Sequence, residues 1–225
     1  MNKHVIITIS RKYGSYGREI GRQLAEYLDI GYYDKEIMEM IAREVGISPE
    51  FFTDDNLNQD GFYTLSKGIR LGVTSLSELT MNAAVFDKAK EMIKEIAKRE
   101  SAVIVGRCAN YILENNTDCI SIYCYSNEED RFNRVIEEYN IPEKEAKKKI
   151  AEMDQKRAKF YEFHTQKKWG NANDFDIVIN TSKVSPQAVV KMLAEAYDDR
   201  LGYSSLKGGY IDQYIHHKKT NQKTE

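Results

Sequence analysis

Short hydrophobic runs alternate along the chain with longer segments in which hydrophobic residues recur at helical spacing. The short runs predict strands at residues 4–10, 102–105, 119–124 and 175–180. The longer segments predict helices at about residues 17–29, 35–45, 74–99, 128–139, 142–168 and 185–201. Strands that alternate with helices in this way predict an α/β fold, with a parallel sheet and helices covering both of its faces.

Two segments depart from this alternation. Residues 47–72 contain Pro49 and several Gly, Asp and Asn residues, which predicts a less regular segment of short helical pieces. The tail from about Gly208 is rich in Lys, Gln and Thr, and we expect it to fray. A chain of 225 residues can bury a substantial core, and we expect one domain over residues 1–225.

The first predicted strand runs into a glycine turn, Gly14-Ser15-Tyr16-Gly17, that leads into a helix. Such a loop can direct several backbone N–H groups at one anion, and the helix N-terminus adds partial positive charge. The standard phosphate-binding loop ends in Gly-Lys-Ser/Thr, whereas here Gly17 is followed by Arg18 and Glu19. Taken alone, the motif indicates either a phosphate site or a structural turn.

Arginines follow the predicted strands or lie in the helices beyond them. Phosphoryl transfer requires concentrated positive charge around the transferred group, and the guanidinium fork suits phosphate oxygens. Each arginine taken singly is explained as well by a surface salt bridge, but as a set on one sheet they favour a phosphate site. The set is Arg18, Arg107, Arg131, Arg134 and Arg157.

Composition narrows the classes of function. The formal net charge of -2 gives no general attraction to nucleic acid or to an anionic membrane surface. No apolar run approaches the roughly 20 residues that span a bilayer, so we expect a cytoplasmic protein without a membrane segment. Cys108, Cys119 and Cys124 are odd in number and lack metal-type spacing, which favours reduced core thiols, and no metal site is predicted from Cys or His.

A series of motifs then follows the order of a known family. They are Ile9-Ser10-Arg11 through Gly14-Ser15-Tyr16-Gly17-Arg18, Gly31-Tyr32-Tyr33-Asp34, Val105-Gly106-Arg107, Asp130-Arg131 with Arg134, Met153-Asp154 with Arg157 and Tyr161, Lys168-Trp169-Gly170, and Ile179-Asn180-Thr181-Ser182. Over nearly its whole length the chain resembles the cytidylate kinase-like group of nucleoside monophosphate kinases, P-loop proteins whose members often lack the loop lysine.

The resemblance implies a P-loop NTPase-like sheet with a helical lid. Residues 35–72 would form an acceptor-binding segment, and residues 142–172 the lid. The resemblance also implies the site residues. Donor ATP would be held by Arg11, Lys12, Gly14, Ser15, Tyr16, Gly17, Arg18 and Glu19; Arg18, Arg131 and Arg157 would be catalytic; and Asp34, Arg107 and Arg134 would bind the acceptor. Asp34 is equally explained as the cap of the helix at 35–45.

The glycine loop departs from the family pattern. If the loop is aligned through Gly14, the lysine position falls on Gly17 and the magnesium-binding hydroxyl position on Glu19. Arg18, Lys12 and Arg11 are all candidates for the lysine's role, and Ser15 is the nearest hydroxyl for a metal-bound water. Cys108 stands where cytidylate kinases more often carry an acidic residue, which leaves the base specificity open.

The function implied is transfer of the γ-phosphoryl group of ATP, with Mg²⁺, to a nucleoside monophosphate, with CMP or a related pyrimidine nucleotide as the leading acceptor. The expected partners are small-molecule nucleotides, without nucleic acid or membrane, and the oligomeric state is left open. Two alternatives remain: a non-catalytic nucleotide-binding or sensing protein, and a kinase for another small acceptor.

Overall fold

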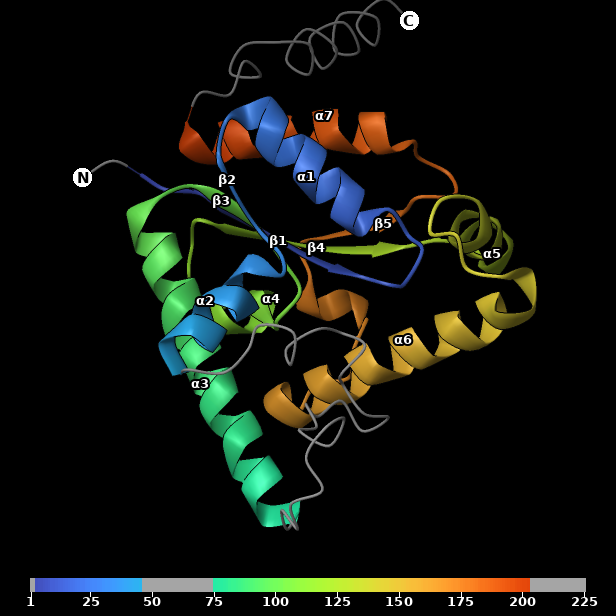
Figure 1. Cartoon of the computed structure of the whole chain (residues 1–225). Helices are drawn as coiled ribbons and strands as arrows, with labels where there is room; N and C mark the ends of the chain where they lie inside the picture. Colours follow the sequence, from blue (N-terminus) through green and yellow to red (C-terminus); the bar gives the residue numbers. More distant parts are fainter. Residues whose placement is uncertain (1–2, 46–74, 203–225) are drawn as a thin grey trace, which may run out of the picture.

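A five-stranded parallel sheet forms the centre of the computed structural model, which describes residues 3–45 and 75–202 (Figure 1). The strand order is β2-β3-β1-β4-β5. The strands are β1 (Ile6–Arg11), β2 (Gly31–Tyr33), β3 (Ala102–Val105), β4 (Cys119–Tyr125) and β5 (Ile177–Asn180). The predicted parallel α/β sheet is therefore confirmed.

Helices cover both faces of this sheet. The helices are α1 (Gly17–Leu28), α2 (Glu36–Val45), α3 (Ser75–Arg99), α4 (Ala109–Ile112), α5 (Glu128–Glu137), α6 (Glu143–Thr165) and α7 (Pro186–Leu201), with a 3₁₀ turn, η3, at Ala172–Asp174. In Figure 1, α1 and α7 lie on one side of the sheet, and α2, α3, α4 and α6 lie on the other. Among the described helices, none is both long enough and apolar enough to cross a bilayer.

Two hydrophobic clusters fill the space between the sheet and its helices. Side chains alternate along a strand, so Ile7 and Ile9 of β1 pack toward α1 and α7, while Ile6 packs toward α2 and α3. β3 divides in the same way, with Val103 on the first face and Ile104 on the second. This double burial explains why the sequence of β3 is an uninterrupted apolar run.

The strand registers bring two turns together at the carboxyl edge of the sheet. Ile9 pairs with Val105, and Gly106 donates its N–H to the Ile9 carbonyl at 2.9 Å. Lys12, just past β1, donates its N–H to the Cys124 carbonyl of β4 at 2.9 Å. The turn after β3 and the glycine loop after β1 are therefore neighbours.

Most predicted elements are confirmed, with small shifts at their ends. β2 and α4 are absent from the sequence-based prediction because three and four residues are too few to establish a period. The expectations for residues 47–72 and for the tail lie outside the described residues. The cysteines are free, with Cys108 and Cys124 buried and Cys119 half-buried, which agrees with the predicted core thiols.

Candidate active site

Two adjoining pockets open at the carboxyl edge of the sheet. The loop pocket, of about 160 Å³, is lined by Arg11 to Glu19 with Tyr139 and Arg157. The arginine pocket, of about 40 Å³, is lined by Ser10, Arg11, Gly106, Arg107, Cys108, Arg157, Phe160, Tyr161 and Trp169. Arg11 and Arg157 line both pockets, so two guanidinium groups stand at the boundary between them.

The glycine loop turns through two left-handed residues before α1 begins. Gly14 has φ of 73° and Tyr16 has φ of 59°, and α1 starts at Gly17. Ser15 is buried, and its hydroxyl lies within donating distance of the Lys12 carbonyl (2.8 Å) and the Cys124 carbonyl (3.0 Å). The Ser15 hydroxyl therefore braces the loop from inside.

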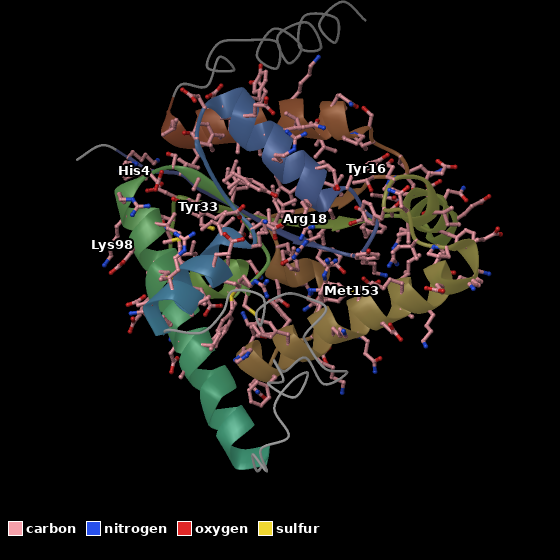
Figure 2. The ribbon with its side chains drawn as sticks, viewed as in Figure 1. His4, Tyr16, Arg18, Tyr33, Lys98 and Met153 are labelled. Carbon is pink, nitrogen blue, oxygen red and sulfur yellow. The ribbon has the colours of Figure 1, made fainter. Side chains whose placement is uncertain are left out.

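Two arginines of α5 hold the loop from its outer side. Arg131 donates from Nε to the Tyr13 carbonyl at 2.7 Å, and Arg134 donates to the Gly14 carbonyl. The Arg134 guanidinium also lies 3.4 Å from the centre of the Tyr16 ring. Both arginine side chains are more than nine-tenths buried. Figure 2 labels Tyr16 and Arg18 near the start of α1.

Helix α6 contacts the same loop through Asp154 and Arg157. Asp154 accepts the Tyr13 N–H on Oδ1 at 2.7 Å and the Arg131 guanidinium on Oδ2 at 2.5 Å. Arg157, one helical turn further on, donates to the Arg11 carbonyl at 3.3 Å, and its guanidinium lies 5.4 Å from the Tyr13 ring centre. One face of α6 therefore binds the loop backbone through Asp154 and Arg157, and it places Arg157 at the boundary between the two pockets.

Asp34, just past the end of β2, forms ion pairs with two arginines. Its carboxylate lies 2.5 Å from Nε of Arg18 and 3.6 Å from a guanidinium nitrogen of Arg11. Helix α2 begins at Glu36, so Asp34 does not occupy the predicted cap position. The Asp34 side chain is nearly buried while that of Arg18 is 54% exposed, so Arg18 has room to change partner.

The turn after β3 holds three consecutive residues in the left-handed region. Gly106, Arg107 and Cys108 have φ of 80°, 54° and 57°, which is unfavourable for the two residues that carry side chains. Burial raises the pKa of the Cys108 thiol well above its usual range. This burial favours the protonated, unreactive form of the thiol.

Replacing Gly106 with alanine is expected to destabilise the fold by about 1–2 kcal/mol, because the left-handed conformation is unfavourable for alanine. The new Cβ would also overlap Nη1 of Arg11 and displace that side chain from both pockets. Urea unfolding measures the first effect, and any activity or anion-binding assay measures the second.

Gly202→Ala is the matched control for Gly106→Ala. Gly202 has φ of 88°, and a Cβ added there would meet no atom of the described residues within 4 Å. This variant therefore carries the backbone strain without crowding the site. Equal behaviour of the two variants in the activity assay would contradict the role given to Arg11.

The structure brings some predicted site residues together and separates others. Arg11, Arg107 and Arg157 converge on the arginine pocket. Arg134, predicted to share the acceptor site with Arg107, lies instead against Gly14 and Tyr16 of the loop. The predicted donor segment, from Arg11 to Glu19, lines the loop pocket throughout.

Several supporting residues were given no role from the sequence. Asp154 binds the loop, Tyr139 donates from its hydroxyl to Glu19 at 3.3 Å, and Thr181 donates from its hydroxyl to the Ser15 carbonyl at 3.1 Å. Asp154 lies three residues before Arg157 on a predicted helix, so helical spacing was a usable signal for it. No such signal pointed to Tyr139, whose role depends on tertiary packing.

Acidic side chains in this region do not gather into a conventional metal centre. Within the described ranges no group of three or more His, Cys, Asp or Glu residues could hold a metal ion. One carboxylate oxygen of a residue that lines the loop pocket nevertheless lacks a partner: Oε2 of Glu19 is buried and finds no hydrogen-bond partner in the described part of the chain.

Several solved structures are similar to this chain. An uncharacterized protein from Eubacterium ventriosum is 26% identical, with a TM-score of 0.66 over 87% of this chain and 99% of its own. Shikimate kinase from Bacteroides thetaiotaomicron is 16% identical, with a TM-score of 0.48 over 86% and 98% of the two chains. The Aquifex aeolicus shikimate kinase is 18% identical, with a TM-score of 0.47 over 88% and 99%.

No curated protein matches the chain. A family model does: the model of the cytidylate kinase-like family matches residues 6–183, which include the glycine loop, both pockets and all five strands of the described sheet. The chain belongs to the cytidylate kinase-like family.

Proposed function

We propose that this protein transfers the γ-phosphoryl group of ATP to a nucleoside monophosphate, with CMP or a related pyrimidine nucleotide as the first acceptor to test. Membership of a kinase-like family supports a phosphotransferase. The observation that carries the proposal is the pair of adjoining pockets that share Arg11 and Arg157. A phosphoryl group that passes from one pocket to the other would cross the boundary where these guanidinium groups lie.

The donor phosphates are assigned to the loop pocket. Backbone N–H groups of a glycine loop and the first turn of α1 favour an anion there. Arg18 is the candidate for the missing lysine because it opens α1 and is more than half exposed. Its present partner, Asp34, would be exchanged for phosphate when nucleotide binds.

The acceptor phosphate is assigned to the arginine pocket, which takes Arg107 from the turn after β3. A phosphate oxygen is already nucleophilic, so catalysis requires alignment and charge neutralisation and no general base. The volume of about 40 Å³ suits a single small anionic group, so the acceptor's nucleoside would extend beyond this pocket. We assign that extension to residues 35–72.

Residues 142–172 are proposed as the lid. Arg157 of α6 would then close over the reacting phosphates, excluding water so that transfer competes with hydrolysis. Arg131 and Arg134, which are buried against the loop, are proposed to position it. Mg²⁺ bound with ATP would supply further positive charge to the phosphates.

An ADP-release assay with ATP, Mg²⁺ and a panel of nucleoside monophosphates tests this function. We expect turnover that depends on the acceptor, and we expect Arg18→Ala to lower it by about 100-fold because one phosphate-directed cation is lost. Arg22→Ala is the matched control, since Arg22 lies one turn further along α1 and pairs at the surface with Glu26.

The same assay, extended to other small acceptors and paired with a measurement of ATP binding, separates the alternatives. Nucleotide binding without turnover on any acceptor would favour a sensing protein. Turnover restricted to acceptors outside the nucleoside monophosphates would retain the kinase and reject the acceptor class. Unchanged turnover in Arg18→Ala would leave the lysine's role to Lys12 or Arg11.

A further inference from the structure

Glu19 is an acidic residue in a pocket otherwise suited to anions. It lies in the first turn of α1 and lines the loop pocket together with the cationic side chains Arg11, Lys12, Arg18 and Arg157. A carboxylate in the first helical turn is favourable for the helix dipole. The same carboxylate would nevertheless repel the phosphates of a bound nucleotide unless a cation lay between them.

The hydrogen bonds of Glu19 leave one oxygen available. Oε1 accepts a hydrogen bond from the Tyr139 hydroxyl at 3.3 Å. Oε2 is buried and has no hydrogen-bond partner among the described residues. Buried carboxylate oxygens are normally satisfied by hydrogen-bond donors or cations. The described residues supply neither to Oε2, which leaves this oxygen for a bound cation.

Three other oxygen-bearing side chains around the loop are already engaged. The Ser15 hydroxyl is directed at the carbonyls of Lys12 and Cys124. Asp34 is paired with Arg11 and Arg18, and Asp154 is paired with Arg131. Glu19 is therefore a carboxylate lining the loop pocket with an oxygen that remains for a cation.

We infer that the Glu19 carboxylate binds the Mg²⁺ that accompanies the nucleotide phosphates, in place of the hydroxyl expected from the family loop. Mg²⁺ is commonly bound by one or two carboxylates together with substrate phosphates and water, so a three-residue acidic cluster is not required. The resemblance to the family loop, aligned through Gly14, implies the same position for the hydroxyl, at Glu19. This inference rests on the proposed nucleotide binding.

The effect of Glu19 on ADP affinity distinguishes a metal-binding role from a structural one, because only a metal-binding role makes its sign depend on the divalent cation. Without a divalent cation, Glu19 opposes the phosphates; with one, it anchors the complex. We therefore expect Glu19→Gln to bind ADP more tightly than the wild type in EDTA. In the presence of ADP, we expect its affinity for Mn²⁺ to fall by about 10- to 100-fold, the range seen when metal sites lose a supporting group.

Calorimetric titration of ADP with and without Mg²⁺, together with electron paramagnetic resonance of Mn²⁺ in the presence of ADP, measures both effects without turnover. Glu26→Gln is the matched control, because Glu26 lies on the same helix and its side chain is 74% exposed. Tyr139→Phe removes the hydrogen bond to Oε1 and keeps the carboxylate.

The expected result is a weakened dependence of ADP binding on the divalent cation in Glu19→Gln alone. If Glu19→Gln keeps the wild-type metal dependence, or if Tyr139→Phe reproduces its effects, the metal role of Glu19 is overturned and nucleotide binding stands. If the wild type binds ADP under neither condition, the proposed function fails and this inference fails with it.

Discussion

Replacing Arg157 with alanine is expected to lower kcat by about 1000-fold, within the range typical of a transition-state arginine. Arg157 lines both pockets, and its guanidinium donates to the Arg11 carbonyl at 3.3 Å. The negative charge of a transferring phosphoryl group would develop at the boundary between the pockets, where Arg157 would counter it. Steady-state kinetics with the acceptor that the ADP-release assay identifies measures the effect.

Arg157→Lys is the informative second variant. Lysine keeps the positive charge but lacks the planar fork that spans two phosphate oxygens, so we expect it to restore only part of the rate. Lys159→Ala is the matched control, since Lys159 is an exposed cation on the same helix. A kcat for Arg157→Ala within a few-fold of the wild type, with an unchanged melting temperature, would remove Arg157 from the catalytic set.

The sheet and the glycine loop could be predicted because their signals are local. An uninterrupted apolar run such as residues 102–105 indicates a strand buried on both faces. A glycine turn between a strand and an amphipathic helix indicates the loop itself, and the structure has α1 starting at Gly17 as expected. Such features can be recognised from a short stretch of sequence without knowledge of the tertiary contacts.

The partners of the arginines could not be predicted in the same way. The sequence showed that Arg131 and Arg134 lie three residues apart on one helix. It did not show what that face of α5 would contact, because this depends on how α5 packs in the fold. Their contacts, Tyr13 and Gly14, are more than a hundred residues away. The ion pairs of Asp34 were missed because helix capping explains an Asp before a helix equally well.

Replacing Arg131 with alanine is expected to destabilise the protein by about 3 kcal/mol, because truncating one member of a buried ion pair leaves the other uncompensated. The Arg131 side chain is 5% exposed, and its partner Asp154 is 19% exposed. For a chain of this size, the loss corresponds to a fall in melting temperature of about 6–12 °C. Thermal unfolding and urea titration measure it.

The double variant Arg131→Ala/Asp154→Ala measures the interaction energy between these two side chains apart from their other contacts. We expect it to be less destabilised than the sum of the two single variants, with an interaction energy of about 1–3 kcal/mol, because neither charge is then left alone. Lys148→Ala is the control for α6, since Lys148 is 80% exposed and pairs only at the surface, with Glu152, in the described part of the chain.

Kinetics of the Arg131→Ala variant test whether the pair positions the loop or only stabilises the fold. Arg131 and Asp154 bind the carbonyl and the N–H of Tyr13, so their loss would release the loop backbone while leaving Arg107 in place. We expect the KM for ATP to rise more than the KM for the acceptor, measured well below the melting temperature. Equal changes in both KM values would assign Arg131 to general stability, and the loop would then owe its conformation to Ser15 and Arg134.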